Sequence, residues 1–346
     1  MSYEEIMKKI TKGLTGEQKK DFIYLMDQLE VYKDHELSKE ILRGIGRLIY
    51  DVAPEETRKE LEQLLENDSL GMQTVLEEAE FQIHKKNFEK ALSILEPAMK
   101  DIEDENGELS RFRDDSVSEY HHFQNQLEEV LYNEVMKPKR KVRIMDGNIG
   151  RLYFLSGYLY FEMGRFEEAK NALNKARKIN PVSVTNIFEL AEIDKKNKDW
   201  DSYLKATKLC LSLSYTAEDL ARSYRNLGFY YIEQEKYDIA TAIYQVSTVY
   251  DPKAATMAQS QLFFIQQMTG NAPTPPKMGE IMKMFEENDI PMGANELVLN
   301  IAMTLANMAE KEKYYDMARY YYSIVYDLTS WEEVKERIDG LPDEDV

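Results

Sequence analysis

The sequence predicts an all-α protein built from antiparallel helix pairs, and three observations carry that prediction. Ten prolines and fifteen glycines are few for 346 residues, as expected of a mostly helical chain. Between Ala221 and Pro252, apolar and small residues recur at helical spacing in two runs, joined by a tight turn at Gln234–Lys236. A similar stretch begins at Gly150, 221 − 150 = 71 residues earlier, which is about two periods of 34 residues. The pattern therefore favours a repeating helical array.

The two helical runs of residues 221–252 carry a recognisable set of side chains. One face of each helix is aromatic or small, and a proline ends the second helix: Tyr224, Leu227, Gly228, Tyr231, Tyr237, Ala240, Tyr244, Ser247 and Pro252. This set closely resembles a tetratricopeptide repeat (TPR), with tyrosine in the place that tryptophan usually takes. The resemblance implies a right-handed αα superhelix, in which Gly228 is expected to meet Ala240 where the two helices of the repeat cross.

Further repeats are visible along the chain. Residues 150–181 are a second good match, and 72–98 and 299–330 also keep the family positions. The stretch 184–214 is degenerate, because Tyr203 stands where a small residue is usual and Cys210 stands at an alanine position. A helix after Pro252 is expected to pair with residues 279–287 across the Pro-rich linker 270–276. The resemblance thus covers roughly residues 72–330.

The N-terminal region, residues 1–70, is predicted to form helical hairpins that match the repeat pattern poorly. Its helices are expected at 2–14, 17–33, 36–52 and 55–66, and we find no DNA-recognition helix in this acidic stretch. The repeat array is expected over residues 71–340. A capping helix at 331–338 should cover the core that an open solenoid end would expose.

One segment of the array, residues 104–146, is an insertion and not a repeat. Residues 117–123 alternate enough for a short strand, and 126–136 have helical spacing. The segment ends in a basic cluster that stands out in an acidic chain: Lys137, Lys139, Arg140, Lys141 and Arg143. Two roles remain open for this cluster, namely pairing with the chain's own acids or docking an acidic partner.

Composition excludes several classes of function. The formal net charge of −19 argues against nucleic-acid binding, which needs clustered Lys and Arg, and against anionic membranes. There is no apolar run of about 18 residues, and the N-terminus is too charged for a secretory signal. Cys210 is the only cysteine, so no intramolecular disulfide forms. We expect a cytoplasmic protein.

No catalytic or cofactor motif emerges from the sequence. The glycines near the N-terminus lack nucleotide-binding spacing, and the four histidines show no zinc spacing. His121 and His122 are adjacent, so their side chains should point apart. Cys210 falls at a packing position. We therefore predict a non-catalytic protein without metal or cofactor.

The family resemblance also implies a binding surface. First helices of such repeats present certain positions to a concave groove, and here these are Arg151, Phe154, Tyr158, Phe161, Arg222, Arg225, Asn226 and Phe229. Aromatic, arginine and amide side chains suit an extended or helical peptide. The expected function is a protein- or peptide-binding scaffold, with a ligand that has a carboxylate anchor and basic flanks. The alternative is a peptide-sensing bacterial regulator acting through a separate output partner. The chaperone carboxylate clamp of some TPR domains is echoed only by Asn226 and its two nearby arginines.

Overall fold

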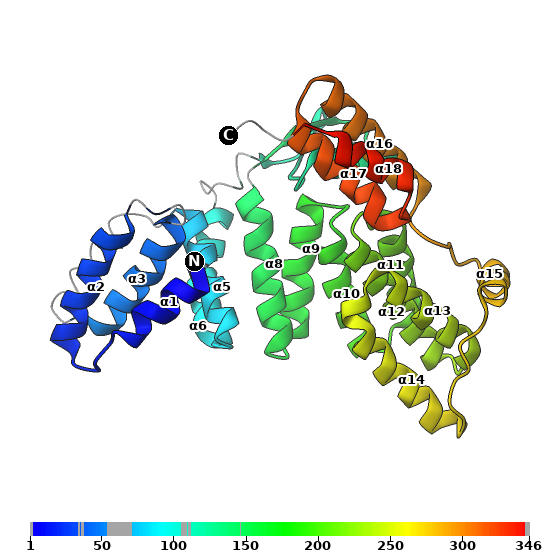
Figure 1. The fold of residues 1–346 in the computed structure, drawn as a ribbon, viewed down its shortest axis with the longest axis horizontal. Helices are drawn as coiled ribbons and strands as arrows, with labels where there is room; N and C mark the ends of the chain where they lie inside the picture. The colour runs from blue at the N-terminus through cyan, green and yellow to red at the C-terminus, as the bar shows by residue number, and fades with distance from the viewer. Residues whose placement is uncertain are drawn as a thin grey trace. The chain divides into compact units, whose positions relative to one another are not determined.

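The computed structural model describes residues 3–33, 35, 38–53, 71–104, 109, 112–145 and 147–342. The chain divides into two compact units, Met1–Thr74 and Val75–Val346. Both consist almost entirely of helices (Figure 1). No helix of the described residues is long and apolar enough to cross a membrane.

The first unit is a small helical cluster. It contains α1 (Tyr3–Lys12), α2 (Gln18–Tyr32) and α3 (Ser38–Val52), close to three of the expected helices. Both α1 and α2 pack against α3. Their apolar faces bury Ile10, Leu25, Ile41 and Ile45 completely, which makes a separate core for this unit. The helix expected at 55–66 falls outside the described residues.

The second unit contains the repeat pairs. They are α5 (Met72–His84) with α6 (Phe88–Glu103), α8 (Gly147–Glu162) with α9 (Phe166–Ile179), α10 (Val184–Lys196) with α11 (Trp200–Leu213), α12 (Ala217–Glu233) with α13 (Tyr237–Tyr250), and α16 (Glu296–Lys311) with α17 (Tyr315–Thr329). Between α8 and α13, each helix packs on the next along the chain, which makes a TPR-like solenoid. The all-α fold class predicted from the sequence is confirmed.

The turn inside each pair follows one design. A residue with left-handed backbone lies two positions before each second helix, at Lys86, Gly164, Lys198, Glu235 and Lys313. Each second helix then begins with an aromatic residue, at Phe88, Phe166, Trp200, Tyr237 and Tyr315. A residue with left-handed backbone ends a helix because it directs the amide groups that follow the helix onto the last, unpaired carbonyl groups of that helix. This shared turn reverses the chain in the same way in every repeat.

Small residues bring the two helices of a pair close together. A Cβ atom on Gly228 would lie 2.9 Å from the ring of Tyr244, and one on Gly157 would lie 2.5 Å from Leu173. Tyr244 and Leu173 occupy equivalent places, 71 residues apart like the two glycines. The atoms nearest to this Cβ position on Gly228 all belong to the ring of Tyr244, and the expected meeting of Gly228 with Ala240 stays a prediction.

The insertion forms a compact β-α-β unit. Strand β1 (Ser118–His121) pairs in parallel with β2 (Lys141–Ile144), and α7 (Gln126–Met136) connects them. The expected strand and helix are confirmed, but the second strand was not predicted because its residues read as a basic cluster. Parallel pairing needs a crossover connection, which α7 supplies. His122 donates its backbone amide to the carbonyl of Ile179, and Asn180 donates to Glu128, so the unit lies against the turn between α9 and α10.

The C-terminal part departs from a simple continuation of the array. Helix α14 (Ala255–Thr269) packs on α13 and α12, whereas α15 (Met278–Glu287) packs on α13. The expected pairing of α15 along α14 is therefore wrong, and Figure 1 draws the two helices apart. The pair α16–α17 returns to pack on α7 and α12, and α18 (Glu332–Gly340) covers α17 as the predicted cap.

Candidate functional site

The centre of the expected groove is an ion pair between two neighbouring first helices. Arg222 on α12 donates to Glu189 on α10 at 3.1 Å, and its guanidinium lies 4.3 Å from the ring centre of Phe188. Glu189 is largely enclosed, with 14% of its side chain exposed. Burial raises the pKa of this carboxyl, and the neighbouring acids Glu192 and Glu162 raise it further, although Arg222 opposes them. The middle of this surface is therefore acidic as well as basic.

Helix α8 contributes an aromatic side chain to the same surface. Tyr158 packs edge-on against Phe88, the first residue of α6, with ring centres 6.5 Å apart. Burial raises the pKa of the Tyr158 hydroxyl, and the charges of Glu162 and Glu189 add to that effect. Tyr158 is half-buried. The charge of Glu162 therefore acts on both Tyr158 and Glu189.

The other end of the surface is an aromatic cluster. Phe229 on α12 contacts Trp200 and Tyr203 of α11, with ring centres 6.1 and 6.2 Å apart. The ammonium group of Lys195 lies 4.2 Å from the Phe229 ring, and Lys195 also pairs with Glu192 at 3.4 Å. Sequence reasoning missed Lys195 and Glu162. Glu162 was nonetheless findable, because it lies four residues after Tyr158 on the same helix face.

Asn226 belongs to the wall of this surface and is 8% exposed. Its backbone carbonyl accepts a hydrogen bond from the Tyr203 hydroxyl at 3.1 Å, whereas its side-chain Nδ2 has no hydrogen-bond partner among the described residues. A buried amide donor without a partner costs free energy. The amide would gain most from a ligand acceptor or a water that reached it.

Most of the remaining expected groove residues have a partner within the chain. Arg225 pairs with Asp251 at the end of α13, 3.3 Å away, and Arg151 pairs with both carboxylate oxygens of Glu80 on α5. Phe161 packs edge-on against Phe166, the first residue of α9. Phe154 is half-buried. All three expected arginines therefore have an acid of the chain itself as partner, so a ligand carboxylate would have to compete for each of them.

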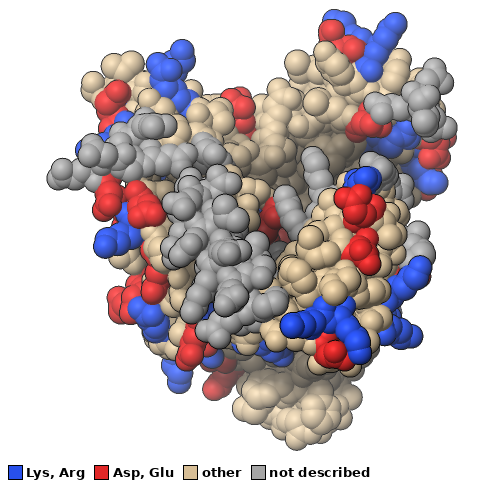
Figure 2. All heavy atoms as spheres, turned by 90° about the vertical axis from the view of Figure 1, so that its left-hand side faces the viewer, with Lys and Arg blue, Asp and Glu red and all other residues tan. Residues whose placement is uncertain are grey.

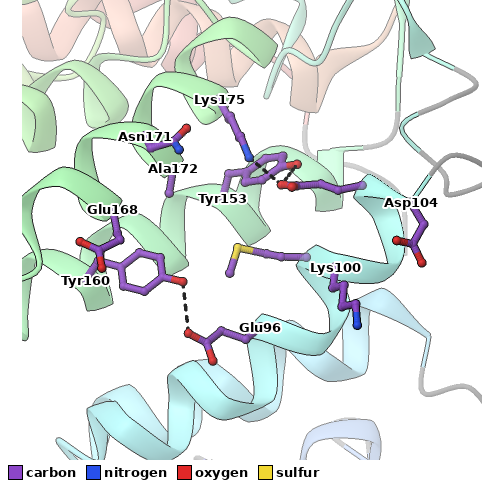
Figure 3. Close-up of a pocket in the computed structure, with 11 residues that line it drawn as sticks. Glu96, Lys100, Asp104, Tyr153, Tyr160, Glu168, Asn171, Ala172 and Lys175 are labelled. Carbon is purple, nitrogen blue, oxygen red and sulfur yellow. Dashed lines mark hydrogen bonds and ion pairs between the residues drawn. The ribbon is translucent and has the colours of Figure 1, made fainter.

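A cavity of about 480 Å³ opens between α6, α8 and α9 (Figure 3). In it, Glu103 accepts hydrogen bonds from the Tyr153 hydroxyl and from Lys175, both at 2.7 Å. Burial opposes ionisation of Glu103, but these two bonds outweigh it and lower its pKa. Tyr160 donates to Glu96 at 3.3 Å across the same cavity. These bonds tie one repeat to the next, and we assign the cavity that structural role.

The basic cluster divides into two groups. Arg140 pairs with the buried Glu119 at 2.8 Å and with Asp114 at 3.6 Å, and Arg143 donates to Ser118 at 2.9 Å. Both arginines therefore bind within the insertion itself. Lys137, Lys139 and Lys141 are exposed. The two arginines therefore stabilise the insertion through contacts within it, whereas the three lysines lie exposed on its surface.

The histidine and the cysteine that were considered for metal binding or reactivity, His121 and Cys210, both lie in the interior of the protein. His121 is buried, with Nδ1 lying 3.3 Å from the carbonyl oxygen of Ile179. Cys210 is buried, and this burial raises the pKa of its thiol. In the part of the chain that the structure describes, no three His, Cys, Asp or Glu side chains gather into a possible metal site.

Charge is dispersed on the face that Figure 2 draws. Acidic and basic side chains alternate there in small groups, with uncharged surface between them. Although the chain has a net charge of −19, the described residues on this face do not form a single acidic patch.

Comparison with known proteins gives one family match and several partial matches to curated proteins. A family model described as tetratricopeptide repeat matches residues 150–183, which are the α8–α9 pair. The Hsp70-Hsp90 organising protein of Plasmodium falciparum (isolate 3D7) is 29% identical over 125 residues, 34% of this chain and 22% of that protein. A TPR repeat-containing protein of Methanocaldococcus jannaschii is 28% identical over 91 residues, 25% of this chain and 16% of that protein.

A third relative is shorter. The uncharacterized protein ycf37 of Pyropia yezoensis is 39% identical over 66 residues, 18% of this chain and 37% of that protein. The alignments therefore span between 16% and 37% of the length of these curated relatives.

Proposed function

Since this chain belongs to the tetratricopeptide repeat family, we propose that it is a non-catalytic scaffold that binds a peptide segment of another protein. The proposed site is the surface of α8, α10 and α12, which we call the first-helix surface: Tyr158, Glu162, Glu189, Glu192, Lys195, Arg222, Asn226 and Phe229. One observation carries the proposal. Side chains of two successive first helices, α10 and α12, meet there in the Glu189–Arg222 pair, and the charge of Glu162 on α8 acts on Glu189.

The chemistry of this surface favours a ligand with a basic group. Burial raises the pKa of Glu189, and the charges of Glu192 and Glu162 add to that effect, while Arg222 opposes it without cancelling it. A Lys or Arg of the ligand would relieve this repulsion. A carboxylate anchor is less suited, because it would have to displace Glu189 from Arg222. We therefore replace the expected acidic anchor by a basic one.

Flanking aromatic side chains would hold the rest of the peptide. Tyr158 lies at one end and Phe229 at the other, and aromatic residues are enriched among the side chains that carry most of the binding energy in interfaces. The unpartnered Nδ2 of Asn226 would gain a hydrogen bond if a backbone carbonyl or a water reached it.

A chaperone-clamp function is not proposed. The Plasmodium relative is named for organising Hsp70 and Hsp90, but its aligned region is 22% of that protein. In this chain the residues that could clamp a carboxylate have other surroundings. Arg222 and Arg225 are paired with acids of the chain, and Asn226 is only 8% exposed.

The test is selection of peptides from a random display library on the full chain. We expect selected peptides to be enriched in Lys or Arg, and Glu189→Gln and Tyr158→Ala each to weaken their binding at least about tenfold. The matched control is Lys205→Ala on the second helix α11, which should bind normally. Selected peptides that bind all three variants as tightly as the original chain would place binding outside the first-helix surface.

A further inference from the structure

Helix α14 has an apolar face that nothing in the described chain covers. Its inner face buries Ala258 and Ile265 against α13. Met257, Phe264 and Met268 recur at i, i+7 and i+11 on another face and are 61%, 43% and 57% exposed. Phe263 beside them is 60% exposed. A helix that is apolar on more than one face is normally buried on each of them.

The helix of this chain that would be expected to cover this face, α15, packs on α13. In a repeat pair, the helix after α14 would cover it, but α15 packs on α13 instead, and both helices are fully described. The linker between them contains Pro273, Pro275 and Pro276. The exposed face of α14 therefore stands open where the array would otherwise add a helix.

The charge pattern indicates what fits this face. Residues 254–276 contain no Asp, Glu, Lys or Arg, in a chain that is 31% charged with a net charge of −19. Two copies of so acidic a chain repel each other wherever charged surfaces meet. A neutral segment is the place where they can touch without that repulsion.

The spacing of the exposed residues points to the same partner. The exposed side chains read nearly the same in both directions, with Met257 and Met268 at the two ends and Phe263 and Phe264 beside the midpoint between Leu262 and Phe263. A contact between identical surfaces brings residue i of one copy to residue j of the other and j to i. In an antiparallel pair of α14 helices, Met257 of each copy would therefore face Met268 of the other. At a rise of 1.5 Å per residue, the two Phe264 side chains would lie about 4.5 Å apart along the axis.

We propose that a second copy of this chain docks on α14, with the two α14 helices antiparallel about a two-fold axis between Leu262 and Phe263. One helix face per copy is a small interface, so we expect a weak association that depends on concentration. This interface shares no residue with the first-helix surface, so variants of one leave the side chains of the other unchanged.

Sedimentation of the full chain over about 1–100 µM tests the association. The average mass should rise from 40.5 kDa towards 2 × 40.5 = 81 kDa. Phe264→Asp and Met268→Glu should each remain at 40.5 kDa throughout, with unchanged circular dichroism because both side chains are exposed. The matched control is Met308→Asp on α16, where Met308 is 57% exposed, and it should associate like the original chain. A monomeric original chain, or association by both α14 variants, would overturn the proposal.

Cross-linking tests the geometry. The only native thiol, Cys210, is buried and its pKa is raised, so it should not react. A mixture of Met257→Cys and Met268→Cys chains should be joined into dimers by a short bismaleimide, whereas either variant alone should not. Dimers formed by each single variant, and not enriched in the mixture, would exclude the antiparallel arrangement.

Discussion

The hydroxyl of Tyr224 joins helix α12 to a loop 67 residues later in the chain. It donates to the carbonyl oxygen of Pro291 at 2.8 Å, and the backbone amide of Gly293 donates to it at 2.8 Å. Tyr224 stands in the tryptophan place of the repeat, and its ring is fully buried. A packing residue of the array therefore also holds the segment that leads into the last repeat pair.

Tyr224→Phe removes this connection while keeping the ring. We expect a loss of about 1–3 kcal/mol of unfolding free energy, because the Gly293 amide is left without its acceptor. Chemical denaturation measures the loss, and faster hydrogen exchange at Gly293 should accompany it. Tyr237→Phe is the control, since the Tyr237 hydroxyl has no hydrogen bond shown among the described residues, and it should change stability little.

Gly228→Ala tests the close approach of α12 and α13. The added Cβ atom would stand 2.9 Å from the ring of Tyr244, so the ring or the helix must shift. We expect a destabilisation of about 1–3 kcal/mol despite the better helix propensity of alanine. Gly279→Ala in α15 is the control, because nothing lies within 4 Å of its Cβ position, and it should be neutral or stabilising. Equal effects of the two substitutions in thermal denaturation would contradict the packing described here.

Charge reversal separates the two parts of the basic cluster. Arg140→Glu would leave the buried Glu119 facing a like charge, so we expect a loss of about 2 kcal/mol, moderated because Arg140 is 37% exposed. Lys139→Glu should stay within about 0.5 kcal/mol, because the Lys139 side chain is exposed. Thermal denaturation of the two variants decides the matter. A larger loss for Lys139→Glu than for Arg140→Glu would refute the internal role of the arginine.

Glu189 should impose a pH dependence on stability. Its folded pKa is raised above the ordinary value of 4.5, so the folded chain holds the proton more tightly than the unfolded chain does. The resulting stabilisation is complete below pH 4.5 and is lost as the pH rises through the raised folded value. We therefore expect the unfolding free energy of the original chain, relative to Glu189→Gln, to fall as the pH increases from 4.5 to 7. A difference that stays constant or grows over this range would show that the pKa is not raised.

The helices could be predicted from the sequence because their signals are local. Periodic apolar residues located α7 at Gln126–Met136, the bounds that it has in the structure. The repeat signature assigned the array for the same reason, since Gly228 and its 71-residue counterpart Gly157 occupy the same place in two pairs. The candidate surface was predicted in part: Tyr158, Arg222, Asn226 and Phe229 lie on or beside it.

The tertiary structure decided which partners these residues meet. Arg225 was expected on the groove but pairs with Asp251, and Arg151 pairs with Glu80, because a long side chain reaches whichever acid the neighbouring helix brings near. Strand β2 forms because β1 offers it an edge, 23 residues away in sequence (141 − 118 = 23). Helix α15 packs on α13 and leaves α14 open. Local spacing determines where a helix forms and which face is apolar, whereas the free energy of packing, summed over distant segments, determines what covers that face.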